Sequence, residues 1–306
     1  MRRVLLVLTS LLCAVGLAAC ADNGTAPALP GNADTSGYDG VISGAPTADA
    51  ATIAASAWAT AVKQRGVLNV GGTDAGPLFS LKNPSTGKVT GFDAGLSQML
   101  ARYILGDPKT QLTITTVDTR ETLLQNATVD AVFATYTITP ARAQKVAFAG
   151  PYYESGDAIM VKVDNTSINA VGDLAGKTVA TEANSTAVLA LQKAVPSAKP
   201  LLFQEDAQCV AAVQQGRADA YVLDQGILIS DASTNPAVKV VGQPFTQEPY
   251  GIGLPRTDPS AQQFVDAWLQ KIYDDGSWAK LWKATIGTVV KGDAPAPPKI
   301  GSAQGS

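Results

Sequence analysis

Segments with strand-like and helix-like patterns alternate along most of the chain, and this order constrains its fold more than any other feature. Short apolar, β-branched runs predict strands at 67–71, 112–117, 129–133, 158–163, 177–181, 200–204, 220–223, 238–241 and 251–254. Longer periodic segments predict helices at 92–104, 120–125, 185–194, 207–215, from 226, 260–274 and 277–286. Strands that alternate with helices form parallel-rich sheets with helices on both faces, so we predict an α/β fold.

The order of these segments also predicts two lobes. The apolar run 158–163 could carry the chain into a second lobe, and 238–254 would bring it back. We therefore expect two mixed, mostly parallel sheets joined by a two-strand hinge, with lobe 1 at 51–161 and 247–290 and lobe 2 at 162–246. The 306 residues suffice for two lobes of about 100 residues each. In such sheets ligands bind at the carboxyl ends of the strands, and two crossings let the lobes close around a ligand.

The composition excludes several functional classes. The chain contains no histidine, which excludes a Ser-His-Asp triad, a histidine general base and most catalytic zinc sites. A net charge of −3 provides no basic surface for nucleic acid. We therefore expect neither an ordinary hydrolase nor a nucleic-acid-binding protein, and no cofactor or metal.

The N-terminus has the pattern of a targeting segment. Arg2 and Arg3 precede an apolar stretch over 4–16, which is too short to span a bilayer as a stable anchor. The Leu-Ala-Ala-Cys sequence that ends at Cys20 resembles the bacterial lipobox, in which the cysteine is diacylated and becomes the new N-terminus. The alternative is a plain secretory signal. We predict a lipoprotein signal peptide over 1–20, with lipidation of Cys20 holding the protein on the extracellular face of the bacterial cytoplasmic membrane.

Both flanks of the central region are predicted to lack a fixed structure. Residues 21–50 are mostly small and polar, which predicts a flexible tether, and the Pro- and Ala-rich segment 291–306 predicts a disordered tail. Cys209 has no cysteine to pair with once Cys20 is lipidated. Its spacing from Val210 and Val213 predicts a small apolar side chain that is buried.

Hydroxyls and a guanidinium converge after the buried strand predicted at 129–133. Thr135 and Thr137 follow this strand, and Arg142 falls in the helical turn that Pro140 starts. A guanidinium binds a carboxylate bidentately, and helix-start amides add donors. The junction therefore suits a small carboxylate, although a structural arginine beside a threonine-rich edge is an open alternative.

The same junction belongs to an ordered set of motifs that resembles a known family. The motifs are Gly91-Phe92-Asp93, a Thr-x-Thr-x-x-x-x-Arg run ending at Arg142, an apolar run ending in Pro151-Tyr152, Asp-Leu-Ala-Gly-Lys-Thr-Val at 173–179, Asn184-Ser185-Thr186, Gly-Arg-Ala-Asp-Ala at 216–220, Asp224, Tyr250-Gly251-Ile252-Gly253 and Gly276-Ser277-Trp278. Together they cover residues 64–288 and resemble the family 3 extracellular solute-binding proteins, the polar amino-acid receptors of bacterial ABC importers. One departure is Gly95, where the family usually has an acidic residue.

The resemblance implies a two-lobed fold like that of the type II periplasmic binding proteins. It implies a monomeric receptor that performs no chemistry, binds an acidic or amide amino acid, and delivers it to an ABC permease with a cytoplasmic ATPase. By the same resemblance, the ligand α-carboxylate would contact Arg142, Thr137, Ser185 and Thr186, and the α-ammonium would contact Asp224 and Thr135. From spacing alone, Ser185 and Asp224 are equally suited to cap the helices that follow them.

The resemblance also implies which residues contact the ligand side chain: Arg120, Lys82, Thr73 and Tyr136. Arg120 lies 15 residues before Thr135, the spacing at which acidic-amino-acid receptors of this family carry a second arginine. The alternative is an exposed arginine paired with Glu121 or a nearby aspartate. A cleft with Arg120, Arg142 and Lys82 favours glutamate or aspartate, and asparagine or glutamine is compatible because arginine also donates to an amide oxygen.

Two other functions remain open from the sequence. The same fold resembles periplasmic dehydratases that act on prephenate-like dicarboxylates, for which Glu182 or Glu154 would be the candidate acid. A sensory domain that reports its ligand to a partner kinase is the other. The predicted lipid anchor favours transport over sensing.

Overall fold

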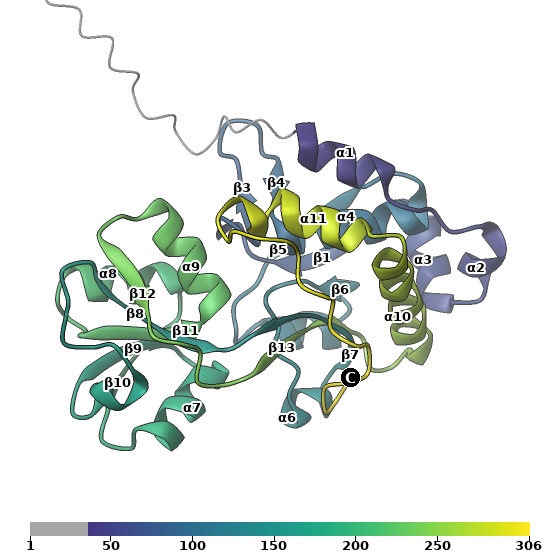
Figure 1. Cartoon of the computed structure of the whole chain (residues 1–306). Helices are drawn as coiled ribbons and strands as arrows, with labels where there is room; N and C mark the ends of the chain where they lie inside the picture. The colour runs from purple at the N-terminus through teal and green to yellow at the C-terminus, as the bar shows by residue number, and fades with distance from the viewer. Residues whose placement is uncertain (1–35) are drawn as a thin grey trace, which may run out of the picture. The chain divides into compact units, whose positions relative to one another are not determined.

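The computed structural model describes residues 36–306, in which two five-stranded sheets provide the framework (Figure 1). The first sheet has the strand order β5-β1-β6-β13-β7. Its strands are β1 (Leu68–Gly72), β5 (Thr110–Ile114), β6 (Ala131–Val132), β7 (Ala147–Ser155) and β13 (Glu248–Leu254). The strands β5, β1 and β6 are parallel, whereas β13 is antiparallel to both of its neighbours.

The second sheet repeats this plan with the order β10-β9-β11-β8-β12. Its strands are β8 (Asp157–Lys162), β9 (Thr178–Glu182), β10 (Lys199–Phe203), β11 (Ala220–Asp224) and β12 (Val238–Val241). Here β8 is antiparallel to both neighbours, and β10, β9 and β11 are parallel. A small sheet of β2 (Ala75–Gly76), β3 (Ser80–Lys82) and β4 (Val89–Thr90) adjoins the first. The predicted fold of two mixed, mostly parallel sheets is confirmed.

Helices cover both sheets (Figure 1). The part of the chain around the first sheet, called lobe 1 below, contains α1 (Ser36–Gly44), α2 (Ala50–Ala54), α3 (Ala57–Arg65), α4 (Phe92–Leu105), α5 (Arg120–Gln125), α6 (Pro140–Ala143), α10 (Pro259–Asp274), α11 (Ser277–Ala284) and η2 (Ile286–Thr288). The part around the second sheet, called lobe 2, contains η1 (Val171–Leu174), α7 (Thr186–Ala194), α8 (Asp206–Gln214) and α9 (Gln225–Thr234).

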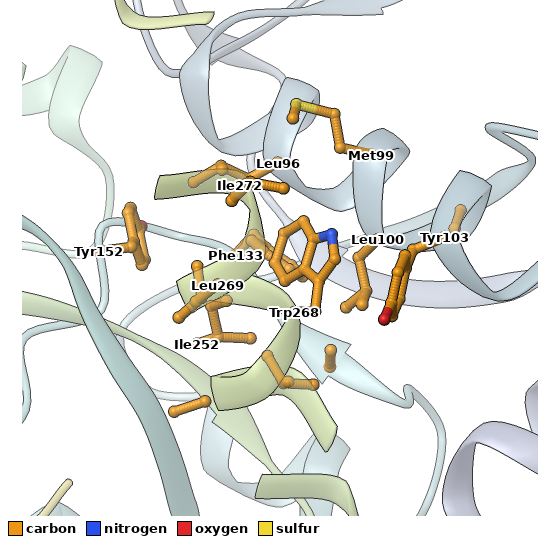
Figure 2. Close-up of a cluster of buried hydrophobic side chains, with 14 of the residues drawn as sticks. Leu96, Met99, Leu100, Tyr103, Phe133, Tyr152, Ile252, Trp268, Leu269 and Ile272 are labelled. Carbon is orange, nitrogen blue, oxygen red and sulfur yellow. The ribbon is translucent and has the colours of Figure 1, made fainter. Parts of the chain in front are cut away.

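In the core of lobe 1, the spacing of apolar residues along α10 determines which side chains pack against α4. Asp258 caps α10 by accepting a hydrogen bond from the Ser260 amide, and Pro259 opens the helix. The apolar positions of α10 then recur every three or four residues, so that Trp268 and Ile272 share one buried face. Figure 2 shows this face packed against the side chains of α4, including Leu96, Met99 and Leu100. Lobe 2 has a core of its own, in which Cys209 is fully buried, as predicted.

The two chain crossings between the lobes run side by side. The first is Ser155–Gly156–Asp157, between β7 and β8, and the second lies between β12 and β13. The Asp157 amide donates to Thr246 Oγ1 at 2.7 Å, and the Phe245 amide donates to the Asp157 carbonyl at 2.9 Å. Gly156 permits this approach, because a Cβ there would overlap the Thr246 carbonyl oxygen.

The first crossing lies earlier than predicted. The run 158–163 was expected to connect the lobes with a boundary at 161, but β8 already begins at Asp157 inside the second sheet. The run is apolar because β8 is buried between two neighbouring strands. The hinge therefore falls at Gly156, at the junction of two consecutive strands.

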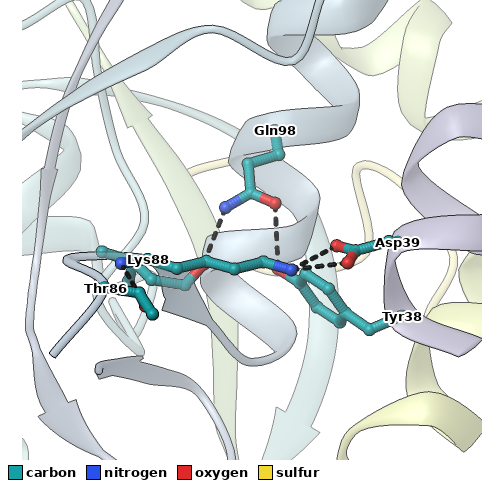
Figure 3. A network of polar contacts seen from close by, with 6 residues as sticks. Tyr38, Asp39, Thr86, Lys88 and Gln98 are labelled. Carbon is teal, nitrogen blue, oxygen red and sulfur yellow. Dashed lines mark hydrogen bonds and ion pairs between the residues drawn. The ribbon is translucent and has the colours of Figure 1, made fainter. Parts of the chain in front are cut away.

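The predicted tether over 21–50 is wrong for its second half. Residues Ser36–Gly44 form α1, whose side chains Tyr38 and Ile42 are only 6 % and 4 % exposed. Figure 3 shows the Tyr38 hydroxyl against Gln98 Oε1 of α4 at 3.1 Å and the Lys88 ammonium on the Asp39 carboxylate. The small residues around α1 hid a helical pattern at Tyr38, Val41 and Ile42, which are spaced to share one face.

The predicted disorder of 291–306 is also wrong. The segment has little regular structure, but the Gly301 amide donates to the Gly150 carbonyl at 2.8 Å, and Ile300 and Ala303 pack against the lobe 1 cores. The Pro-rich composition prevented a helix without preventing packing. The predicted signal peptide, Cys20 and the tether up to residue 35 lie outside the described residues. Within 36–306, no helix is both long and apolar enough to cross a bilayer.

Candidate functional site

A cavity of about 450 Å³ lies between the two lobes. It sits at the carboxyl ends of parallel strands, since Thr73 follows β1, Thr115 follows β5, Glu182 ends β9 and Gln204 follows β10. Ligand sites of open α/β sheets occur at this position, and pockets for small molecules occupy roughly 300–1,000 Å³. Of the residues predicted to contact a ligand, Thr73, Arg120 and Thr135 line the cavity.

Arg120, at the start of α5, lies in the lobe 1 wall and is only 5 % exposed. Its Nη1 donates to the Ala134 carbonyl at 3.2 Å, and its guanidinium carbon lies 3.8 Å from the centre of the Tyr136 ring. The Nε atom has no hydrogen-bond partner among the described residues. Glu121 binds Lys145 at 2.8 Å instead, so an exposed Arg120–Glu121 pair does not form. A buried cation with a free donor beside a cavity is suited to a polar ligand.

Burial sets the protonation of this wall. It lowers the pKa of Arg120 to about 10, with the Arg142 charge adding to the effect. Arg120 is therefore still cationic at neutral pH. Tyr136 is fully buried beneath both guanidinium groups, with the Arg142 carbon 5.3 Å from its ring centre. Its face supports the two cations, although Tyr136 itself does not line the cavity.

Thr135 is held by a buried aspartate. The Thr135 amide donates to Asp93 Oδ2 at 2.8 Å, and Asp93 Oδ1 accepts from the Tyr152 hydroxyl at 2.7 Å. Thr135 has a φ of 44°, in the left-handed region that a non-glycine residue rarely adopts. Asp93 therefore fixes a strained backbone beside the cavity, a role that the Gly-Phe-Asp motif alone did not reveal. Tyr152, which the sequence places in the Pro151-Tyr152 motif, is fully buried as the partner of Asp93.

Arg142 lies in α6, whose start is capped by the Thr139 hydroxyl accepting from the Arg142 amide at 3.2 Å. Its Nη1 donates to the Thr137 carbonyl at 2.9 Å. Burial lowers the pKa of Arg142, and the opposing charges of Asp224 and Glu248 partly restore it. Arg142 and Thr137 do not line the 450 Å³ cavity. Arg142 lies over the Tyr136 ring and interacts electrostatically with Asp224.

Asp224 ends β11 and directly precedes α9, but its side chain makes no capping hydrogen bond. It is 5 % exposed, and its Oδ1 atom has no partner among the described residues. Burial raises the pKa of Asp224 to about 7, and the Glu248 carboxylate raises it further while Arg142 lowers it. The capping alternative is therefore excluded, and the carboxylate is available to a cation.

The three remaining predicted ligand contacts, Ser185, Thr186 and Lys82, lie outside the cavity wall. Ser185 is 8 % exposed and donates to the Glu182 carbonyl at 2.7 Å rather than capping α7, which Thr186 begins. Lys82 is exposed at the end of β3. None of these three residues lines the cavity.

The lobe 2 wall carries acidic groups that the sequence interpretation did not combine. Glu182, Glu205, Asp206 and Asp231 line it, and the Tyr221 hydroxyl donates to Asp206 Oδ1 at 2.7 Å. Burial and the charge of Asp206 raise the pKa of Glu182 to about 8 and that of Asp231 to about 9. Glu205 and Asp206 are the first two residues after the predicted strand 200–204, which is a sequence signal that could have found them.

Contacts between the lobes lie on both sides of the cavity. Asn184 Nδ2 of lobe 2 donates to Asp118 Oδ1 of lobe 1 at 2.6 Å. The Leu78 amide of lobe 1 donates to Ser230 Oγ of α9 at 2.9 Å. The lobes are thus in contact around the cavity, as expected for a site that encloses its ligand.

Comparison with known proteins agrees with this geometry. The model of the bacterial extracellular solute-binding proteins, family 3, matches residues 68–288. The ABC transporter glutamine-binding protein GlnH of Bacillus subtilis is 36 % identical over 211 residues, which cover 68 % of this chain and 77 % of the relative. The glutamine-binding protein of Geobacillus stearothermophilus is 40 % identical over 194 residues, covering 63 % and 74 %.

A glutamate-binding protein and a solved structure extend the comparison. The glutamate-binding protein GluB of Corynebacterium efficiens is 31 % identical over 236 residues, covering 73 % of this chain and 80 % of the relative. An ancestral arginine-binding protein, solved with arginine and with glutamine, has a TM-score of 0.67 and 31 % identity, covering 73 % of this chain and 99 % of that protein. The chain therefore belongs to the family 3 bacterial extracellular solute-binding proteins.

Proposed function

We propose that this chain is the receptor of an ABC importer for an amino acid with an amide or acidic side chain, and that glutamine fits its site best. Membership of the family supports the receptor role, in which the protein binds its ligand, closes, and delivers it to a permease served by a cytoplasmic ATPase. The receptor itself performs no chemistry. The curated relatives with glutamine or glutamate in their names support this class of ligand.

The proposal that the ligand is glutamine rests on the different chemistry of the two cavity walls. Arg120 offers a guanidinium donor from lobe 1, and Glu182, Asp206 and Asp231 offer carboxyl oxygens from lobe 2. A side-chain amide has an oxygen that accepts and an NH₂ group that donates, so it can satisfy both walls at once. A second carboxylate would face the acidic wall and require these groups to stay protonated. Glutamine is therefore preferred over glutamate.

The α-amino and α-carboxylate groups require a separate pair of charges. Arg142 in lobe 1 and Asp224 in lobe 2 influence each other's ionisation, and among the ion pairs of residues 36–306 there is none between them. An amino-acid zwitterion between them would place its carboxylate on Arg142 and its ammonium on Asp224. Thr137, whose carbonyl accepts from Arg142, would assist the carboxylate from lobe 1, and Ser185 and Thr186 at the start of α7 would assist it from lobe 2. Thr135 would assist the ammonium, and Lys82 and Thr73 would lie at the rim.

Calorimetric titration of the protein with glutamine, asparagine, glutamate, aspartate, arginine and lysine tests this proposal. We expect glutamine to bind most tightly at pH 7, and glutamate to lose further affinity relative to glutamine as the pH rises through 8 to 9 and Glu182 and Asp231 ionise. Preference for arginine or lysine would overturn the amide assignment and leave the receptor role intact. The absence of binding to every amino acid would overturn the receptor role.

The position of Glu182 in the cavity wall favours one alternative function, that of a dehydratase. Glu182 is a partly buried carboxyl with a raised pKa in the cavity wall, as a general acid requires, whereas Glu154 does not line this cavity. A dehydratase would convert prephenate to phenylpyruvate with release of water and carbon dioxide, and phenylpyruvate absorbs in the ultraviolet. Turnover that is abolished by Glu182→Gln would support the enzyme, and we expect no turnover.

We also propose that Cys20 carries the lipid that holds the receptor at the membrane. Mass spectrometry of the protein from a bacterial host should show cleavage before Cys20 and a diacylglyceryl adduct on it. A soluble Cys20→Ala protein would agree with this anchor. An unmodified Cys20 in the mature protein would contradict it.

A further inference from the structure

Three buried carboxylates meet where the chain crosses between the lobes. Asp157 opens β8 and pairs directly with Asp224, the last residue of β11, in the antiparallel register. Glu248 opens β13 and pairs with Ser155, the last residue of β7. Only Gly156 separates Ser155 from Asp157, so all three acids lie at the ends of the strands that form the hinge. We call them the hinge carboxylates.

The hinge carboxylates are more deeply buried than the acids of the cavity wall. Asp157 is 0 % exposed, and Asp224 and Glu248 are each 5 % exposed. Both carboxyl oxygens of Asp157, one of Asp224 and one of Glu248 find no hydrogen-bond partner within residues 36–306. None of the three forms an ion pair with a described residue. Buried polar groups are normally satisfied, because each orphaned one costs about 1–3 kcal/mol.

Arg142, the guanidinium that acts on both Asp224 and Glu248, is already engaged. Arg142 acts on Asp224 and Glu248 from lobe 1, but its Nη1 donates to the Thr137 carbonyl and its guanidinium lies over Tyr136. The other charged or titratable groups that act on Asp224 are Arg120, Glu182, Tyr153 and Tyr250. Among the described residues, the Tyr250 and Ser155 hydroxyls are unpartnered donors beside these acids, against four unpartnered carboxyl oxygens. Acceptors therefore still outnumber donors, which a cationic donor would correct.

We infer that Asp157 and Glu248 join Asp224 as the ammonium site of the receptor, and that binding of a primary ammonium expels a proton from the hinge carboxylates into solution. This inference rests on the proposed function, because the ammonium is that of the bound amino acid. An ammonium has three N–H donors, one for each carboxylate. The ligand keeps its own proton: the bond that breaks is a carboxyl O–H of the hinge, and the proton leaves to the buffer.

The ionisation of the free hinge explains why a proton is available. Burial, together with the charges of Asp224 and Glu248, raises the pKa of Asp157 to about 8. Burial and Glu248 raise that of Asp224 to about 7. At neutral pH the free receptor thus holds protons on this group, and a bound cation favours the fully ionised form. Binding and deprotonation are linked, so affinity falls as the pH decreases.

Titration calorimetry with glutamine in two buffers of different ionisation enthalpy measures the proton directly. At pH 7 we expect the binding enthalpies in phosphate and Tris to differ by the equivalent of about half to one released proton. Between pH 7 and pH 6 the affinity should fall about three- to tenfold, since each linked proton gives at most tenfold per pH unit. An unchanged enthalpy across buffers, with unchanged affinity between pH 6 and pH 8, would overturn the inference.

Substitutions of the hinge carboxylates test whether the released proton comes from them. Asp157→Asn should reduce the released proton, flatten the pH dependence and weaken glutamine binding about tenfold at pH 8, and Glu248→Gln should act in the same direction. The matched control is Asp266→Asn, a partly buried carboxyl on α10 whose pKa is raised to about 6 but which accepts from the Gly150 amide far from the hinge. The control should leave affinity and proton release unchanged. Full proton release in both hinge variants would overturn the assignment.

The design separates this inference from the proposed function. Failure of every amino acid to bind would reject the receptor role itself. Binding without proton exchange would reject only the hinge carboxylates as the linked group. Should a variant fail to fold by circular dichroism, the two-buffer comparison on the unmodified protein still decides the result.

Discussion

At the scale of single residues, the proposed site is defined by ionisable groups that the protein buries without pairing them. Arg120 has a free Nε in the wall of a cavity, and Asp157 has two orphaned oxygens at the hinge. A buried charge without a partner is destabilising, so it is retained where it contacts something that is bound. The sequence could suggest Arg120 through its resemblance to family members that carry a second arginine at this spacing from Thr135. It could not suggest Asp157 beside Glu248, because 91 residues separate them and only the sheet registers bring them together.

Replacing Arg120 tests the contact with the ligand side chain. Arg120→Met keeps much of the apolar stem above Tyr136 but removes the donors, so glutamine should bind about 10- to 100-fold more weakly, as expected for losing one or two charged hydrogen bonds. Calorimetric dissociation constants measure the loss. The matched control is Glu121→Gln, which alters the next residue and its surface ion pair with Lys145. Equal affinities of Arg120→Met and the unmodified protein would remove Arg120 from the site.

The hinge carboxylates should also affect the stability of the free receptor. Folding raises the pKa of Asp157 to about 8, so the folded state holds this proton more tightly than the unfolded state. The resulting stabilisation is complete below about pH 4, the unfolded pKa, and is lost as the pH rises through 8. An asparagine at this position cannot ionise, so Asp157→Asn does not lose this stabilisation as the pH rises. Its thermal unfolding midpoint should exceed that of the unmodified protein by several degrees at pH 8. The difference should shrink towards pH 5, and a constant difference would contradict the cause.

At the scale of elements, periodic patterns predicted most strands and helices because burial enforces them. The apolar stripe of α10 and the apolar run of β8 are examples in which one face or both faces are covered. The predictions from the sequence were wrong at α1 and at the segment 291–306, where no fixed structure was expected. There, few large side chains are surrounded by small ones, so average composition suggests disorder while individual contacts determine the structure.

The packing of α1 can be measured through one buried side chain. Ile42 is 4 % exposed in the lobe 1 core, so Ile42→Ala should reduce the free energy of unfolding by about 2–4 kcal/mol, through lost burial and the cavity left behind. Urea unfolding followed by tryptophan fluorescence provides the measurement. Ser43→Ala, at an exposed position of the same helix, should change the stability by less than about 0.5 kcal/mol. A loss below that value for Ile42→Ala would mean that α1 is detached in solution.

At the scale of the whole molecule, the proposed site is complete only when both lobes contribute. Arg142 and Arg120 come from lobe 1, whereas Asp224 and the acidic wall come from lobe 2. The crossings at Gly156 and before β13 are hydrogen-bonded to each other, which leaves them as the natural axis for opening. Strand and helix patterns could predict each lobe separately. They contain no information on which loops meet across the cavity, because those contacts depend on the closure angle.

The contact between Asn184 and Asp118 makes closure measurable, because it joins the lobes without lining the cavity. Asp118→Ala removes it from the lobe 1 side and avoids altering Asn184, whose φ of 60° would strain an alanine. The loss of one exposed hydrogen bond should weaken glutamine binding about two- to tenfold. Because the contact forms only after the lobes meet, the change should appear in the dissociation rate, measured by stopped-flow fluorescence. Asp107→Ala, an exposed aspartate elsewhere on lobe 1, should leave both rates unchanged. A slower association with an unaltered dissociation rate would show that Asp118 guides the ligand into the open receptor and does not hold the closed one.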